Sequence, residues 1–182
     1  MRNIYVLTGM SGVGKTSLIN KLLKKGSFYY PKIYTTRPTR DEIVDGKIHI
    51  GDYEYEKLQN KIVEFMYNYQ KYAITNGEIQ KADIVDLPPS GIKSLKKNYF
   101  SNKKIIIIYL WIDEFERIKR MKKRGENEEN IYSRLRYEKI EYQNIEEYVD
   151  YTIKNDEFEK CVNKILSVMA LNENGEKDLW FE

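Results

Sequence analysis

The chain alternates between short apolar runs and longer polar segments. Residues 3–8 are rich in Ile, Val and Leu, and residues 105–111 are apolar throughout, which is typical of strands buried in a parallel sheet. Shorter runs at residues 83–87 and 151–154 indicate two further core strands. Residues 15–25 carry apolar side chains at helical spacing and precede a glycine, so they predict a helix. A strand, a glycine-rich turn and a helix in this order predict an α/β fold.

The polar segments are expected to contain most of the helices. Residues 32–82 combine short strand-like pieces with one predicted helix at residues 53–61. Further helices are predicted at residues 90–97, 113–123 and 130–147, the second of them basic and the third polar. One face of a C-terminal helix is expected to be buried and to consist of Phe158, Val162, Ile165 and Met169.

Composition limits the class of protein. The 182 residues suffice for one domain with a substantial core, and 41% hydrophobic with 32% charged residues is typical of a globular protein. No apolar run is long enough to cross a bilayer, and the N-terminus lacks a signal-peptide cleavage pattern. The net charge of +3 is too small to indicate nucleic-acid binding, and the single cysteine, Cys161, fits a reducing compartment. We expect a cytoplasmic monomer or homodimer that binds neither membrane nor nucleic acid.

The motif that carries chemistry lies between the first strand and the first helix, and it runs Gly9-Met10-Ser11-Gly12-Val13-Gly14-Lys15-Thr16. It fits the P-loop pattern G-x-x-x-x-G-K-[ST] in the required context. The glycines allow backbone N–H groups to surround phosphate oxygens, and the helix N-terminus adds partial positive charge. Lys15 is expected to contact the outer phosphates, Thr16 to ligate Mg²⁺, and Ser17 to complete the nucleotide site. ATP and Mg²⁺ are therefore the expected cofactors.

Phosphate binding alone leaves the reaction open, and a GTPase is the first alternative. Ras-type GTPases usually recognise guanine with N-K-x-D after a core strand. The Asn-Lys pairs that begin at residues 20, 60, 102 and 163 all lack an Asp two places later. Their sequence disfavours a GTPase but leaves that alternative open.

A second cluster contains two arginines three residues apart, in the run Thr35-Thr36-Arg37-Pro38-Thr39-Arg40. Arg37 and Arg40 could bind one phosphate through their paired N–H groups, although a solvated basic turn is the simpler interpretation of the pair alone. The run resembles the T-T-R-x-P-R motif of the guanylate kinase family, with the proline moved by one place. In the next family motif, G-E-x-x-G-x-x-Y, Gly46 matches the second Gly and Glu42 lies close to the Glu, and His49 stands where that family has a phosphate-binding Tyr.

The resemblance to guanylate kinases extends over roughly residues 3 to 170. Residues 84–92 are similar to the family's strand V-I-L-D-I-D-x-Q-G-x, with Asp86 at the first Asp. Two arginines, Arg120 and Arg124, are similar to the lid motif R-x-x-x-R-G. Only the P-loop is decisive by itself, so the resemblance depends on the order and spacing of all the motifs together.

Two later segments continue the resemblance. Residues 131–135 are similar to the motif I-x-x-R-L, which contributes Arg134, and Glu141 matches a downstream Glu. Residues 150–156 are similar to the family's last strand, which ends in N-D beside the adenine site and so contributes Asn155. In a kinase lid, arginines of this kind would close over the transferring phosphoryl group and offset its charge. A solvated helix face is the other interpretation of these basic residues.

The resemblance implies a three-layer P-loop NTPase fold with a parallel central sheet, an inserted lobe that binds a nucleoside monophosphate (NMP), and a helical lid. One domain would span residues 1–171, with its core at residues 1–31, 83–119 and 135–171, its acceptor-binding lobe at 32–82 and its lid at 120–134, followed by a loose tail at 172–182.

The resemblance also implies roles for individual residues. Catalysis would depend on Lys15, Arg37, Arg120, Arg124 and Arg134. ATP would be bound by Gly9, Ser11, Gly12, Val13, Gly14, Lys15, Thr16, Ser17 and Asn155. The acceptor would be bound by Arg37, Arg40, His49, Tyr67 and Tyr72. Mg²⁺ would be held by Thr16 and Asp86.

The chain departs from the family at the positions that recognise guanine. The family uses a Glu and an Asp there, and this chain has Tyr67 and Pro88 instead. Ile33 or Tyr34 occupies the region of a guanine-contacting Ser. A pocket built for guanine without these carboxylates would leave its N1–H and exocyclic amine unpaired. GMP is therefore doubtful as the acceptor.

The function predicted from the sequence is transfer of the ATP γ-phosphoryl group to a nucleoside or deoxynucleoside monophosphate. The first alternative is a ribose 1,5-bisphosphate phosphokinase, whose family shares this fold and lacks base recognition. The second is a non-catalytic protein-binding module of the kind found in scaffold proteins. Such modules tend to have degraded phosphate loops, whereas Gly14-Lys15-Thr16 is intact here.

Overall fold

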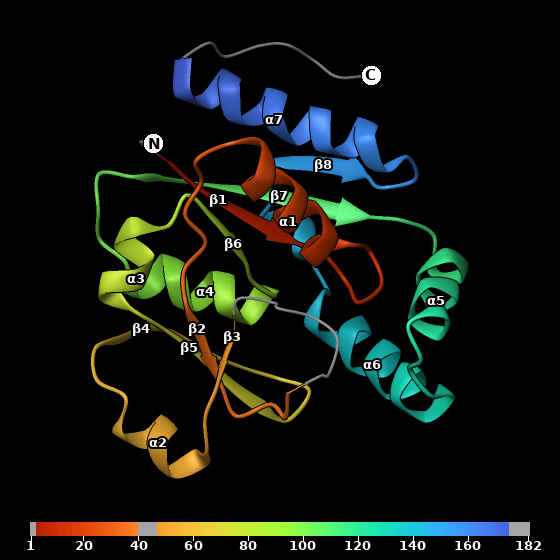
Figure 1. Ribbon diagram of the computed structural model, residues 1–182, viewed down its shortest axis with the longest axis horizontal. Helices are drawn as coiled ribbons and strands as arrows, with labels where there is room; N and C mark the ends of the chain where they lie inside the picture. Colours follow the sequence, from red (N-terminus) through yellow and green to blue (C-terminus); the bar gives the residue numbers. More distant parts are fainter. Residues whose placement is uncertain (1–2, 40–46, 175–182) are drawn as a thin grey trace.

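The computed structural model describes residues 3–39 and 47–174 (Figure 1). Its central sheet is parallel throughout and has the order β6-β1-β7-β8. The four strands are β1 (Asn3–Thr8), β6 (Ile84–Asp86), β7 (Lys104–Trp111) and β8 (Tyr151–Lys154). All four lie where the apolar runs predict core strands.

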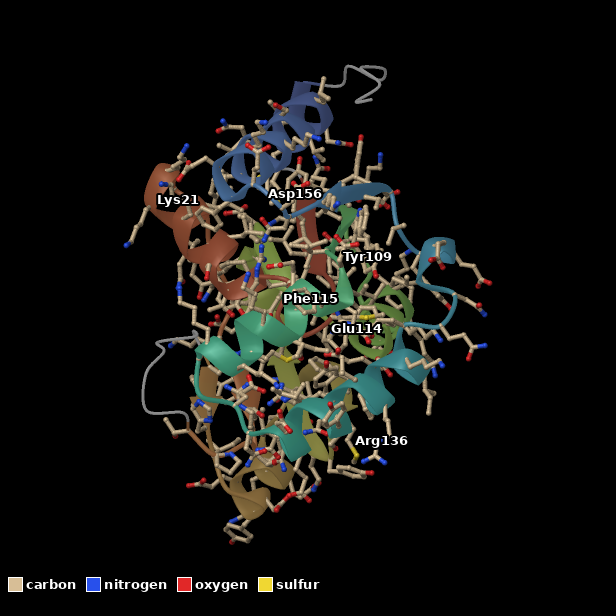
Figure 2. The ribbon with its side chains drawn as sticks, turned by 90° about the vertical axis from the view of Figure 1, so that its right-hand side faces the viewer. Lys21, Tyr109, Glu114, Phe115, Arg136 and Asp156 are labelled. Carbon is tan, nitrogen blue, oxygen red and sulfur yellow. The ribbon has the colours of Figure 1, made fainter. Side chains whose placement is uncertain are left out.

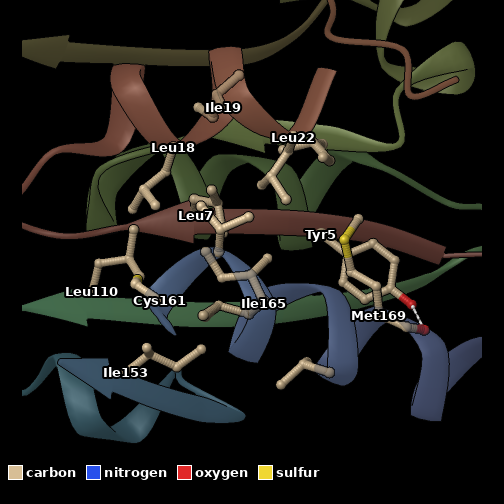
Figure 3. Packing of buried hydrophobic residues seen from close by; sticks show 14 of the residues in the cluster. Tyr5, Leu7, Leu18, Ile19, Leu22, Leu110, Ile153, Cys161, Ile165 and Met169 are labelled. Atoms are coloured by element: carbon tan, nitrogen blue, oxygen red, sulfur yellow. Dashed lines mark hydrogen bonds between the residues drawn. The ribbon is translucent and has the colours of Figure 1, made fainter. Parts of the chain in front are cut away.

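Two helices, α1 (Lys15–Lys25) and α7 (Phe158–Asn174), cover one face of this sheet (Figure 1). Side chains of a strand alternate between the two faces. Tyr5 and Leu7 of β1 accordingly pack among the apolar residues of α1 and α7, and the Tyr5 hydroxyl donates a hydrogen bond to the Met169 carbonyl oxygen at 3.0 Å (Figure 3). This layer fixes α1, and with it the loop that precedes α1.

The opposite face of the central sheet packs against α4 (Pro89–Asn98) and a second sheet. The second sheet has the order β3-β2-β5-β4, in which β2 and β3 are parallel and the other pairs antiparallel. Its strands and its two short helices are β2 (Ile33–Thr35), β3 (Lys47–His49), β4 (Lys61–Tyr67), β5 (Gln70–Thr75), α2 (Asp52–Lys57) and α3 (Asn76–Lys81). Val6 of β1 and Val63 of β4 are buried in the same apolar cluster. This cluster therefore positions the second sheet against the core.

The remaining helices, α5 (Glu114–Lys123) and α6 (Glu128–Glu141), connect β7 to a short 3-10 helix, η1 (Ile145–Glu147). Figure 2 shows them on the side facing the viewer, with Glu114 and Phe115 on α5 and Arg136 on α6. In Figure 1, α6 lies beside the second sheet, and α5 lies above it toward the central sheet. Hydrogen bonds between Glu138 and Ser11 and between Tyr137 and Met66 show that α6 contacts both the loop after β1 and the second sheet.

Two predicted helices are too long. The helix predicted at residues 53–61 ends at Lys57, because Leu58 is extended and Asn60 has a φ of 57° before β4 begins. The helix predicted at residues 130–147 ends at Glu141, and Asn144, with a φ of 62°, separates it from η1. Asparagine tolerates this left-handed conformation, which a helix cannot continue through.

The predictions for the C-terminal helix need two corrections. Phe158 is 38% exposed at the first position of α7, and the buried stripe instead includes Cys161 and Val168. The helix also runs to Asn174, so residues 172–174, predicted as part of a loose tail, are helical. Asn172 Nδ2 donates to the Tyr151 hydroxyl at 3.0 Å, which helps to dock this last turn. Residues 175–182 lie outside the described residues.

Candidate active site

The glycine-rich loop between β1 and α1 requires glycine where the backbone turns. Gly12 and Gly14 have φ values of 82° and 99°, which favour glycine. A side chain at Gly12 would also lie 2.6 Å from the Arg117 carbonyl oxygen. The loop thus passes close to α5 and ends at the N-terminus of α1, where backbone N–H groups have no helical partner. This geometry suits a phosphate.

Polar side chains from other segments of the chain hold the loop backbone in place. Asn155 Nδ2 donates to the Val13 carbonyl oxygen at 2.6 Å, and Arg120 Nη2 donates to the Asn155 carbonyl oxygen at 2.9 Å. The Tyr142 hydroxyl donates to the Gly9 carbonyl oxygen at 2.8 Å. Arg120 and Asn155, both expected to contact ligand, do not line the cavity among the residues that the structure describes. Both side chains contact the carbonyl oxygen of Val13 in the loop, and their binding of ligand remains a prediction.

A cavity of about 610 Å³ extends from the loop to the second sheet. From the loop and α1 it is lined by Ser11, Gly12, Gly14, Lys15, Thr16, Ser17 and Asn20. From the second sheet it is lined by Ile33, Arg37, Lys47, Phe65, Tyr67 and Tyr72. The other described lining residues are Asp86, Leu87, Pro88, Arg124, Arg134 and Tyr142. Five of these side chains are cationic and only Asp86, among the described ones, is acidic, so the cavity suits a ligand with several negative charges.

Lys15 lies inside this cavity rather than standing free at the loop surface. Its ammonium donates hydrogen bonds to the carbonyl oxygens of Gly9 and, at 3.4 Å, Met10. Burial lowers the pKa of Lys15 to about 8, although the charges of Asp86 and Glu138 oppose the shift. Lys15 is thus a poorly hydrated cation next to the loop, where an anionic phosphate would stabilise its charge.

Asp86 ends β6 and lies at the phosphate end of the cavity. Its carboxylate accepts a hydrogen bond from the Tyr30 hydroxyl and lies 3.9 Å from Lys47 Nζ. The described residues contain no cluster of three His, Cys, Asp or Glu side chains that could bind a metal by themselves. Mg²⁺ in phosphoryl-transfer enzymes takes most of its ligands from phosphates and water. The Thr16 hydroxyl and the Asp86 carboxylate, which line the same cavity, fit that kind of site.

Two arginines reach the cavity from the end of α5 and from α6. Arg124 and Arg134 both pair with Glu126, at 2.5 and 3.2 Å. Arg134 Nη1 also donates to Ser11 Oγ at 3.4 Å. Both arginines line the cavity and Arg134 contacts the phosphate loop, while their catalytic role stays a prediction.

The acceptor side of the cavity combines aromatic rings with Arg37. Tyr72 is buried and stacks on Phe65, with the ring centroids 5.0 Å apart. His49 Nδ1 lies 2.6 Å from the Arg37 carbonyl oxygen, so His49 contacts the arginine's backbone and is not among the described lining residues. Arg40, predicted to bind the acceptor phosphate, lies outside the described residues.

Glu138 is a site residue that the sequence did not reveal. It is fully buried on α6, and its carboxylate accepts hydrogen bonds from Ser11 N at 2.6 Å and from the Tyr67 hydroxyl. Its other oxygen accepts from Arg117 Nη1 at 3.1 Å. In the sequence, Glu138 belongs to a polar helix and Arg117 to a basic one, so only their burial distinguishes them. Lys47 of β3 is a second cavity-lining residue that the sequence did not indicate.

Comparison with known proteins decides the family. The protein-family model described as "Guanylate kinase" matches residues 1–172. The chain belongs to the guanylate kinase family. A guanylate kinase of Syntrophus aciditrophicus is 33% identical over 88% of this chain and 82% of its own length. One of Mycoplasma genitalium is 32% identical over 91% of this chain and 74% of its own.

A solved structure agrees on the fold. The crystal structure of guanylate kinase from Anaplasma phagocytophilum matches with a TM-score of 0.71 and covers 93% of this chain and 85% of its own. The sequence identity is 17%, so this likeness supports the fold alone. The resemblance, the α/β P-loop fold and the assignment as a phosphotransferase of the NMP kinase type are thereby confirmed. Among the helices of the described ranges, none is long and apolar enough to span a membrane.

Proposed function

We propose that this guanylate kinase family member transfers the γ-phosphoryl group of Mg²⁺-bound ATP to the phosphate of a nucleoside or deoxynucleoside monophosphate. The observation that carries the proposal is the continuous cavity, which has the phosphate loop on one wall and Arg37 with an aromatic surface on the other. A donor phosphate at the loop and an acceptor phosphate at Arg37 would therefore face each other without intervening protein.

The donor half would act mainly through position and charge. Backbone N–H groups of the loop and the α1 N-terminus would bind the outer phosphates, with Lys15 beside them. Thr16 and Asp86 would hold Mg²⁺, which would offset charge on the phosphates. Arg124 and Arg134 would add positive charge where the transferring group becomes most anionic. Arg120 and Asn155 would act through the loop backbone that they contact.

The acceptor half would bind the phosphate of the acceptor strongly, and it would select its base less strictly than a site with carboxylates for guanine. Arg37, together with Arg40, supplies planar N–H pairs that fit phosphate oxygens. The base would lie against Tyr67, Tyr72 and Phe65, whose rings offer stacking surface. Pro88 and Ile33 also line this part of the cavity and have no side-chain polar group. GMP would therefore have no carboxylate partner there and is not the expected preferred acceptor.

Formation of ADP in the presence of different acceptors tests this function. The panel contains GMP, dGMP, AMP, CMP, UMP, dTMP and ribose 1,5-bisphosphate, each with Mg²⁺ and ATP. Stoichiometric ADP and a nucleoside diphosphate are expected with at least one monophosphate. Turnover with ribose 1,5-bisphosphate alone would indicate the sugar phosphokinase instead, and ATP binding without turnover of any acceptor would contradict the proposed kinase.

A further inference from the structure

A single carboxylate oxygen of Glu138 joins the two halves of the cavity. Oε1 accepts a hydrogen bond from Ser11 N at 2.6 Å and a second one from the Tyr67 hydroxyl. Ser11 belongs to the phosphate loop and Tyr67 to the end of β4 in the second sheet, and both residues line the cavity. The loop and the acceptor side are therefore connected through one atom that is carried by α6.

The surroundings of Glu138 favour one geometry for this junction. The side chains of Glu138 and Arg117 are 1% and 6% exposed, and they form an ion pair at 3.1 Å. Arg117 Nη1 also donates to the Ser11 carbonyl oxygen at 3.3 Å, so both polar groups of the Ser11 backbone are bound by this pair. A buried charge is costly unless its hydrogen bonds are made. Displacing Ser11 or Tyr67 would therefore disturb the whole cluster.

We propose that Glu138 is a positioning residue that couples nucleotide binding at the phosphate loop to the ordering of the acceptor side at β4. A nucleotide that orders the loop also fixes the donor Ser11 N, and through Glu138 it fixes the Tyr67 hydroxyl. Coupling of this kind is reciprocal, so an acceptor that orders Tyr67 also favours nucleotide binding. The inference rests on the proposed function only for the identity of the nucleotide.

The chain offers a matched pair of substitutions. Tyr67→Phe removes the hydroxyl bound to Glu138 and leaves the contacts of Glu138 with Ser11 and Arg117 in place. Tyr137→Phe removes a hydroxyl that also links α6 to β4, since it donates to the Met66 carbonyl oxygen at 3.0 Å. Among the described residues, the Tyr137 hydroxyl does not bond to the phosphate loop, and the Tyr137 ring packs edge-on against Tyr67 at 5.1 Å. Both variants thus lose one hydrogen bond between α6 and β4, but only the bond lost in Tyr67→Phe is to Glu138, which also binds the phosphate loop.

Hydrogen–deuterium exchange of the whole protein, with and without Mg²⁺ and the non-hydrolysable analogue AMP-PNP, measures the coupling. We expect the analogue to slow exchange in β4 (Lys61–Tyr67) at least about fivefold in the unmodified protein, the lower end of typical coupling. Tyr137→Phe should keep this protection, and Tyr67→Phe should reduce it to less than about twofold while still binding the analogue. Equal protection in the two variants would overturn the proposal.

A second variant removes the carboxylate without leaving a buried unpaired charge. The double substitution Arg117→Leu with Glu138→Leu replaces both members of the ion pair by apolar side chains, a change that buried pairs often tolerate. It should bind AMP-PNP and lose the protection of β4, and retained protection would overturn the role of Glu138. If the unmodified protein bound AMP-PNP without slower exchange in β4, the proposed coupling would be wrong and the proposed function would be unaffected. If it bound no nucleotide, the proposed function would fail as well.

Discussion

The phosphate-loop side and the acceptor side of the cavity are built from different kinds of group. The loop side uses consecutive residues, 9–16, and its geometry depends on backbone conformation at Gly12 and Gly14. The acceptor side uses side chains from strands of a mixed sheet that are distant in sequence, such as Arg37 after β2 and Tyr67 in β4. Glycines with a positive φ tolerate few substitutions, whereas side chains on a sheet can change one at a time. The family's phosphate chemistry can therefore persist while base recognition changes.

Loss of Lys15 should disable the loop side alone and should reduce phosphoryl transfer more than any of the other substitutions. Lys15→Ala should keep the circular dichroism of the folded protein and lower the single-turnover rate of phosphoryl transfer by about 10³-fold, since a buried cation beside the phosphates is lost. Lys21→Ala serves as control, because Lys21 lies on the same helix and pairs at the surface with Glu159 (Figure 2). Unchanged turnover in folded Lys15→Ala would contradict a role of Lys15 in phosphoryl transfer.

The acceptor side should respond separately to loss of its arginines. Arg37→Ala and Arg40→Ala should each lower kcat/KM for the acceptor by about ten- to 100-fold, the value of one or two charge-assisted hydrogen bonds. Affinity for an ATP analogue should stay within about twofold of the original. Arg136→Ala, at an exposed arginine of α6, is the control (Figure 2). Equal loss of acceptor and analogue binding would mean that the two sides are not separable.

The two sides of the cavity should also differ in the pH dependence of kcat/KM. Burial lowers the pKa of Lys15 to about 8, so the free enzyme should lose this positive charge as the pH rises above that value. We expect kcat/KM for ATP to be about tenfold lower at pH 9 than at pH 7. With ATP saturating, bound phosphates should keep Lys15 charged, and kcat/KM for the acceptor should change by less than about twofold. A flat profile for ATP up to pH 9.5 would contradict the importance of the Lys15 charge.

The same contrast explains what the sequence could predict. The apolar strands and the loop motif depend on local patterns, so β1, β7 and the turn into α1 are all predictable from the residues themselves. The end of α2 at Lys57 and the burial of Glu138 depend on which segments meet in three dimensions. A glutamate at that position of a polar helix gives no local signal of burial, because its partners Ser11, Tyr67 and Arg117 come from three other elements.

The ratio of kcat/KM values for GMP and for the other acceptors tests whether the acceptor side has lost its recognition of guanine. Asp86, which we place at Mg²⁺, is the only acidic residue among the described lining residues, and Tyr67 and Pro88 offer no carboxylate. Two missing polar partners, at about 1–3 kcal/mol each, would remove a strong preference for guanine. Under common Mg²⁺ and ATP conditions, GMP should not exceed every other acceptor of the panel by more than about tenfold, which corresponds to ~1.4 kcal/mol. A larger margin for GMP would show that polar groups other than carboxylates at positions 67 and 88 recognise guanine.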